Sequence, residues 1–208
     1  NQDFFERIGQ SLPIRRSFRN WLSEKLLLEN DDIKSFIEEI IESKEIEPFW
    51  KDEILVSVLL GMILTLPISS AALAIILNLS GLAGGAATVG CCANMVGFAV
   101  ASFKENGISG LISQGLGTSM LQVPNIMKKP IIWIPAIIAS AILGPISTAV
   151  LHMTNNASGA GMGTAGLVGQ LMTWQDMSGT ENGVELIIKI ILLHLILPGV
   201  IAWITSYL

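Results

Sequence analysis

Charged residues are scarce in this sequence. Asp, Glu, Lys and Arg make up 14% of the 208 residues, and hydrophobic residues make up 51%, whereas an ordinary soluble domain carries roughly 25% charged residues. This composition argues against a soluble enzyme. The formal net charge of −5 and the absence of a basic face exclude a nucleic-acid-binding protein, so we expect no nucleic acid partner.

Cysteine is equally rare. Cys91 and Cys92 are adjacent in an apolar run, so they provide neither a disulfide framework nor the spacing of metal ligands. The apolar part of the chain also lacks paired carboxylates and a Ser/His/Asp arrangement. We therefore expect no catalytic residue, no metal and no cofactor in this chain.

The few charges lie mostly at one end of the chain. Residues 1–53 hold 8 of the 12 Lys and Arg residues and 13 of the 17 Asp and Glu residues, which accounts for the whole net charge (8 − 13 = −5). Residues 54–103 and 130–175 contain no charged residue at all. A membrane-spanning helix needs only about 20 apolar residues, so the sequence predicts an all-α, multi-pass membrane domain over residues 54–208.

Residues 1–53 are predicted to form a separate amphipathic helical segment on the cytoplasmic side. Apolar residues at i, i+3, i+4, i+7 and i+8 begin at Ile33 and predict a helix over residues 31–42. A second amphipathic stretch surrounds Trp21. It forms either a solvated hairpin with the first helix or, through the neighbouring arginines, a contact with lipid headgroups.

Four crossings are predicted, at residues 54–78, 82–103, 131–151 and 184–206, with a kink at Pro67. Residues 108–127 and 155–173 are uncharged but rich in glycine, and we interpret them as re-entrant or broken segments. With the N-terminal segment in the cytoplasm, this layout also places Lys104, Lys128 and Lys129 there and His152 outside, as the positive-inside rule requires.

The two glycine-rich segments share a pattern. Gly115-Leu-Gly-Thr-Ser119 matches Gly161-Met-Gly-Thr-Ala165, and a glutamine follows each match, at positions 122 and 170. In the predicted layout they enter the membrane from opposite sides, which is the signature of an inverted repeat. Similar composition alone is the alternative explanation. Non-helical backbone at membrane depth occurs where it is buried in protein or lines a wet cavity.

These segments offer neutral hydrogen-bonding side chains, which suit a neutral sugar or polyol. A cation path would instead show a buried carboxylate. The predicted ligand-binding residues are Gln114, Thr118, Ser119, Gln122, Asn125, His152, Asn155, Asn156, Thr164 and Gln170. The cluster that starts at His152 has an alternative interpretation as a loop that ends a helix. For His194 we expect an interhelical hydrogen bond and no ligand role.

Over Gly107–Asn125 (GISGLISQGLGTSMLQVPN) and Asn155–Gln170 (NNASGAGMGTAGLVGQ) the sequence resembles a known family. The resemblance is to the IIC-like membrane components of the bacterial phosphotransferase system, in the branch that includes the perfringolysin regulator. It covers roughly residues 54–208, which look like the C-terminal half of a family member. It implies a homodimeric α-helical protein of the bacterial cytoplasmic membrane that takes up sugar and works with a separate phosphorylated IIB partner.

One departure from the family pattern affects the expected activity. Sugar-phosphorylating members place a glutamate, often with a histidine, at the sugar, and neither glycine-rich segment contains a glutamate. Phosphorylation would therefore rest with the separate partner. Three hypotheses follow: a sugar- or polyol-translocating subunit, a non-transporting membrane sensor or regulator with a cytoplasmic regulatory partner, and a small channel or scaffold without a ligand.

Overall fold

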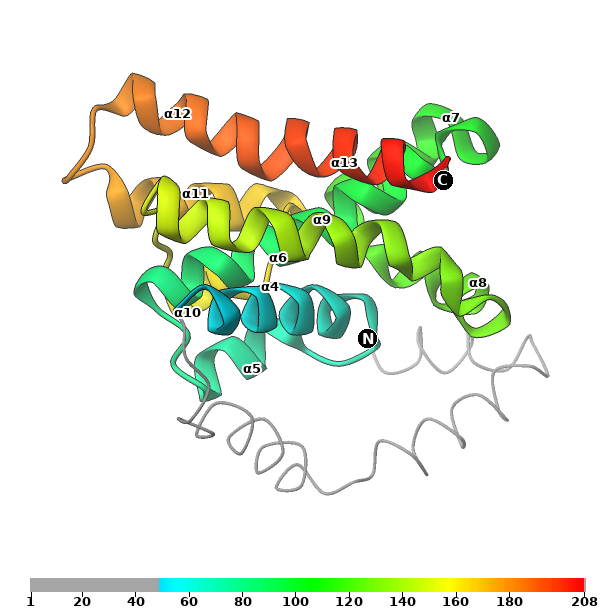
Figure 1. Cartoon of the computed structure of the whole chain (residues 1–208), viewed down its shortest axis with the longest axis horizontal. Coiled ribbons are helices and arrows are strands. Elements are labelled where there is room, and N and C mark those ends of the chain that lie inside the picture. Colours follow the sequence, from blue (N-terminus) through cyan, green and yellow to red (C-terminus); the bar gives the residue numbers. More distant parts are fainter. Residues whose placement is uncertain (1–48, 208) are drawn as a thin grey trace, which may run out of the picture. The chain divides into compact units, whose positions relative to one another are not determined.

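The computed structural model describes residues 49–207, and these residues form an all-α membrane domain (Figure 1). The amphipathic helices predicted within residues 1–48 lie outside the described residues. Six short 3₁₀- and π-helical stretches, η1 to η6, interrupt or join the described α-helices. In chain order the elements are α4 Phe49–Thr65, α5 Ser70–Ile76, α6 Gly81–Ala101, α7 Phe103–Ile112, η1 Ser113–Gly117, η2 Ser119–Gln122, α8 Val123–Lys128, η3 Pro130–Trp133, α9 Ile134–Pro145, η4 Ile146–Val150, α10 Ala157–Ala160, η5 Ala165–Leu167, α11 Val168–Met177, α12 Gly183–Ile191, η6 Leu192–Ile196 and α13 Leu197–Ser206.

Three helices are long and apolar enough to cross a membrane. They are Gly81–Ala101, Pro130–Val150 and Gly183–Ser206, and they confirm that long apolar helices form at residues 82–103, 131–151 and 184–206, as predicted. The second of them consists of η3, α9 and η4, and the third of α12, η6 and α13. These long helices contain single π-turns, η4 and η6, which are frequently found at functional sites.

Helix α6 is the centre of the domain. Its residues from Gly84 to Ala99 are all buried, and α4, α9 and α13 pack around it. Small residues make this arrangement possible, because helix backbones can approach closely only where side chains are short. At Gly90, for example, an added Cβ would lie 1.8 Å from the carbonyl oxygen of Ser57 in α4.

Helix α4 runs parallel to α6 and antiparallel to α9. Along α6, Gly90 lies against Ser57 and Asn94 contacts Thr65, so both residue numbers rise together. Against α9 the order is reversed, since Ser57 donates its hydroxyl to the carbonyl oxygen of Ser140 at 2.9 Å, and Gly144 lies next to the backbone of Glu53. The start of α4 therefore lies toward the C-terminal end of α9.

The stretch predicted as a single crossing at residues 54–78 has a different structure. Helix α4 ends at Thr65, Pro67 lies in the following turn, and α5 leads the chain back toward Gly81. Gly81 accepts a hydrogen bond from Asn155 at 3.1 Å, just beyond the C-terminal end of the α9–η4 helix. The stretch thus begins and ends at the same end of α6. Proline at position 67 lacks an N–H and disfavours helix at the preceding residue, so it ends the helix instead of only kinking it.

This path changes the expected sidedness. We predict that cysteines introduced as Trp50→Cys and Ser80→Cys react with a membrane-impermeant maleimide from one side, and Lys129→Cys from the other. Cys91 and Cys92 are buried and can be replaced by alanine for this labelling in vesicles. The layout predicted from the sequence requires two crossings between residue 53 and Lys104. It would be supported instead if the cysteines at positions 50 and 129 reacted from the same side.

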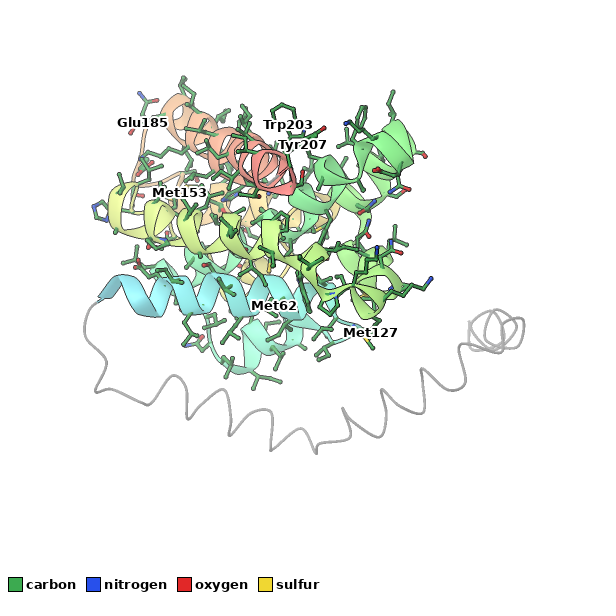
Figure 2. All side chains as sticks on the ribbon, turned by 45° about the vertical axis from the view of Figure 1, so that its right-hand side comes forward. Met62, Met127, Met153, Glu185, Trp203 and Tyr207 are labelled. Carbon is green, nitrogen blue, oxygen red and sulfur yellow. The ribbon has the colours of Figure 1, made fainter. Side chains whose placement is uncertain are left out.

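Positive and negative side chains separate toward the two ends of α6. Figure 1 shows α7, α8 and the C-terminal end together, away from the junction of α11 and α12. At this end the ammonium group of Lys104 lies 4.9 Å from the centre of the Tyr207 ring, and their hydrogen bond raises the pKa of Lys104. Trp203 packs edge-on against Tyr207 (Figure 2). Such a mixture of aromatic and basic side chains is typical of a membrane interface.

Acidic side chains gather at the other end, around the start of α12. The ammonium group of Lys189 lies 2.8 Å from Glu181 and 3.2 Å from Glu185, and Asp176 accepts a hydrogen bond from Thr154 at 2.6 Å. Within the described residues, this end therefore carries more acidic than basic groups.

Candidate functional site at the meeting of two glycine-rich segments

The first glycine-rich segment is broken at Thr118. Helix α7 continues into the π-turn η1, which ends at Gly117, and Thr118 then adopts an extended conformation (φ −159°, ψ 136°). Its hydroxyl accepts a hydrogen bond from the backbone N–H of Met120 at 3.2 Å and so caps η2. The predicted break in this helix is present.

The second segment is broken by three residues with positive φ. These are Gly163 (φ 53°), Gly166 (φ 54°) and Leu167 (φ 60°), between the single turn α10 and helix α11. Positive φ is accessible to glycine at little cost but strained for leucine. At Gly163 a side chain would also lie 2.8 Å from the backbone of Cys91 in α6, so glycine allows the segment to contact the central helix.

The two broken segments contact each other directly. Thr164, which is fully buried, donates its hydroxyl to the carbonyl oxygen of Gly115. These two residues belong to the matching motifs that the sequence suggested as a repeat. The hydrogen bond therefore joins the two motifs at the point where both backbones leave regular helix geometry.

One face of α6 holds both segments. Its contact positions are spaced by three, four or seven residues, which places them on one side of a helix. The first segment reaches this face from the C-terminal end of α6 through Ser102, and the second from the N-terminal end through Thr88. The contacts, in order along α6, are Thr88 with Asn155 (2.7 Å), Cys92 with Gln170 (3.3 Å), Met95 with Thr164 (3.5 Å) and Ser102 with Gln114 (3.0 Å).

Three predicted residues of the first segment form a chain of hydrogen bonds. Gln122 donates from Nε2 to Gln114 Oε1 at 2.7 Å, and Asn125 donates from Nδ2 to Gln122 Oε1 at 2.9 Å. Gln114 and Gln122 are buried, whereas Asn125 is exposed. Ser119 is separate from this chain and accepts a hydrogen bond from Thr65 at 3.1 Å.

Asn155 is the polar centre of the second segment. It is fully buried, and its amide donates to the hydroxyl of Thr88 at 2.7 Å and to the carbonyl oxygen of Gly169 at 3.2 Å. Its side-chain oxygen accepts from the N–H of Asn156 at 2.8 Å. Asn156 in turn caps α10 through the N–H of Gly159. Both asparagines thus shape the segment.

Gln170 leaves one buried polar atom free. The residue is 8% exposed, and its Nε2 lies 3.3 Å from both Cys92 Sγ and His194 Nδ1. Within the described part of the chain, its Oε1 has no hydrogen-bond partner. Turning the amide over would exchange the two atoms and leave the NH₂ group free instead. In either orientation Gln170 can take one more partner, and His194 makes the expected interhelical contact.

His152 lies away from this group. Its side chain is exposed, its φ is 49°, and its N–H bonds to Thr148 at the end of η4. This placement fits the alternative interpretation as a loop that ends a helix. The structure therefore brings the second segment to α6 through Asn155, Thr164 and Gln170.

A second buried polar group, centred on Asn94, was not predicted from the sequence. Asn94, buried in α6, accepts a hydrogen bond from Trp133 Nε1 at 3.0 Å and donates one to Ser140 at 3.3 Å, and its side-chain oxygen lies 3.4 Å from the Thr65 hydroxyl. The sequence offered one signal, since Asn94 is the sole amide side chain between Gly81 and Phe103. Thr65 gave none, because it lay inside a predicted uniform crossing.

The chemistry of the site is that of neutral hydrogen bonding. In the searched residues of the described chain, no group of three or more His, Cys, Asp or Glu side chains could hold a metal ion. The side chains at the meeting point are amides, hydroxyls and thiols, with a histidine behind them. Such groups recognise hydroxyl groups of a ligand through paired donors and acceptors.

Comparison with known proteins identifies the family. The family model described as "Phosphotransferase system, EIIC" matches residues 31–208, so the match extends beyond residue 54 into the N-terminal segment. No curated protein and no solved structure matched this sequence. With most of its length matched by the model, the chain belongs to the EIIC family of phosphotransferase system membrane components.

Proposed function

We propose that this chain binds a small neutral sugar or polyol where the two glycine-rich segments meet, and moves it across the bacterial cytoplasmic membrane as a multi-pass subunit. The direct contact of the two broken segments, through Thr164 and Gly115, carries the proposal. Broken segments from opposite ends of a membrane domain are the typical place for substrate in transporters, since unwound backbone supplies free hydrogen-bonding groups.

Gln170 supports a hydroxyl-bearing ligand in particular. A buried polar atom without a partner costs roughly 1–3 kcal/mol, and a ligand hydroxyl at Gln170 would recover part of this cost. The neutral site also fits an uncharged ligand, because a buried charge would need a compensating partner. We propose Gln114, Thr118, Ser119, Gln122, Asn125, Asn155, Asn156, Thr164 and Gln170 as the residues that line or shape the site.

Neither glycine-rich segment contains a carboxylate, and this favours phosphorylation of the sugar by a separate protein. We propose that a separate phosphorylated IIB-type partner carries out any sugar phosphorylation, and that the functional unit is a homodimer. The same observation favours a second candidate, a sensor of the same family that binds the sugar without transporting it. Uptake into membrane vesicles separates the two, since a sensor would bind the sugar without accumulating it.

The experiment that tests ligand binding is a thermal-shift screen of the purified full chain. Glucose, galactose, mannose, mannitol and sorbitol are suitable probes. We expect at least one to raise the unfolding temperature, because a ligand at 100 times its Kd stabilises the folded state by about 2.7 kcal/mol. Gln170→Leu should remove this shift. Thr148→Val should keep it, because within residues 49–207 the Thr148 hydroxyl bonds only to Gly144 of its own helix. No shift with any probe, or an unchanged shift in Gln170→Leu, would refute the proposal.

A further inference from the structure

A short part of the first segment, Gly115–Ser119, is held at both ends by threonines. We call these residues the gate segment. At its start Thr164 donates a hydrogen bond to the carbonyl oxygen of Gly115, and at its end Thr65 donates to Ser119 Oγ at 3.1 Å. Thr65, Thr164 and Ser119 are all fully buried.

The two threonines reach the gate segment from the same direction. Thr65 is the last residue of α4, which starts at the Gly81 end of α6, and Thr164 follows α10, which lies next to α5. The hydroxyl of Ser70 in α5 donates to the carbonyl oxygen of Gly161 at 2.6 Å. This hydrogen bond links the α4–α5 stretch that carries Thr65 to the segment that carries Thr164. The gate segment itself follows α7, beyond the opposite end of α6. The contacts therefore join two groups of elements that come from opposite ends of the domain.

Apart from these two hydrogen bonds, the gate segment packs mainly against α6. Leu116 and Gly117 are exposed. A Cβ added at Gly115 would first meet Ala99 at 3.5 Å, and one added at Gly117 would meet nothing closer than 4.0 Å. This packing is loose compared with Gly90 or Gly163, where an added Cβ would lie within 3 Å of a neighbouring backbone. The closest helix contacts of the domain therefore lie outside the gate segment.

We infer that Thr65 and Thr164 are positioning residues that hold the gate segment in its closed position, and that breaking their two hydrogen bonds opens the site toward the Lys104 end of the domain. That the opening gives access to a ligand site rests on the proposed function. The closed position of the gate segment is inferred from the two hydrogen bonds. Thr65 is a residue for which the sequence suggested no role. It lies at the end of α4, beside Asn94.

The test measures how quickly a cysteine at position 118 reacts, because this position is half-buried in the gate segment and leaves the hydroxyl of Ser119 in place. In the full chain with Cys91 and Cys92 replaced by alanine, Thr118→Cys should react slowly with a membrane-impermeant maleimide added from the Lys104 side. Thr65→Val and Thr164→Val should each raise the rate about fivefold, as expected for the loss of one neutral hydrogen bond, and the double variant more than either. Thr65→Ser and Thr164→Ser keep the hydroxyl and should restore the slow rate.

Thr148→Val is the matched control, because it removes a buried threonine hydroxyl that does not touch the gate segment. Rates for Thr65→Val and Thr164→Val within twofold of this control would overturn the inference. Should Thr118→Cys fail to fold, Ser119→Cys still reports on the Thr164 hydrogen bond to Gly115, although it replaces the acceptor of Thr65. The assay contains no sugar, so its outcome is independent of the proposed function, which fails separately if no probe binds.

A cross-link provides the second measurement. The hydroxyl oxygens of Thr65 and Ser119 lie 3.1 Å apart, so cysteines at both positions are within reach of a disulfide. Oxidation of Thr65→Cys/Ser119→Cys should hold the gate segment closed and reduce vesicle uptake of a bound probe sugar at least tenfold, reversibly on reduction. Uptake unaffected by a formed cross-link would contradict the inference.

Discussion

Gly90→Leu is expected to prevent the described helices from packing into their observed arrangement. A Cβ at this position would lie 1.8 Å from the carbonyl oxygen of Ser57 and 2.4 Å from its carbon. Both clashing groups are helix backbone, so neither can turn aside as a flexible side chain would. The contact lies where α4 packs on the buried centre of α6, and we expect a loss of more than about 4 kcal/mol in stability.

Gly179→Leu is the matched control for this variant. An added Cβ at Gly179 would meet nothing within 4 Å, so this variant should retain native stability. Purification in mild detergent followed by gel filtration compares the two proteins. A monodisperse Gly90→Leu protein with the unfolding temperature of Gly179→Leu would show that α4 and α6 are not in contact as described.

Asn155→Leu should produce the second largest loss of stability. Leucine has nearly the same shape but makes no hydrogen bond, so the three bonds of the buried amide, to Thr88, Gly169 and Asn156, would all disappear. At about 1 kcal/mol for each bond, we expect a destabilisation of about 3 kcal/mol. The N–H of Asn156 would lose its partner inside the protein.

The exposed amide of Asn125 provides the comparison. Among the described residues this amide makes a single hydrogen bond, to Gln122, so Asn125→Leu should cost less than about 1 kcal/mol. Thermal unfolding in detergent, without sugar, measures both variants. Equal unfolding temperatures for Asn155→Leu and Asn125→Leu would mean that Asn155 does not organise the second segment.

The membrane architecture could be predicted because it depends on local composition. The three long helices are predominantly apolar, and each begins at or next to a glycine or a lysine in the sequence. The breaks at Thr118 and Gly163 were also foreseeable. Clusters of glycine lower helix propensity and permit positive φ regardless of what surrounds them.

The path of residues 54–78 could not be predicted in the same way. The apolar content of residues 54–78 fits one spanning helix and two shorter helices that run out and back equally well. A proline such as Pro67 is tolerated in many membrane helices. The difference depends on tertiary contacts of the returning helix, such as the hydrogen bond from Ser70 to Gly161 across 91 residues of sequence. The sequence pattern of residues 54–78 alone does not indicate that Gly161 is the partner of Ser70.

For the candidate site, too, residue types could be predicted from the sequence but the contacts between them could not. The sequence indicated which side chains could bind a neutral ligand, but the partners of each amide had to come from the fold. Asn155 and Thr88 are 67 residues apart, Thr164 and Gly115 are 49 residues apart, and Gln170 and Cys92 are 78 residues apart. Asn94 and Thr65 were missed for this reason, since their importance lies in contacts with Trp133 and Ser119.

The central claim is that one ligand site is formed jointly by the two glycine-rich segments, and hydrogen exchange of the full chain tests it most directly. Amide exchange is measured by mass spectrometry with and without a saturating concentration of the sugar or polyol that gives the largest thermal shift. The account predicts that slower exchange appears together in residues 113–122 and 161–170. Protection confined to one of these segments, or found only elsewhere in the chain, would contradict it.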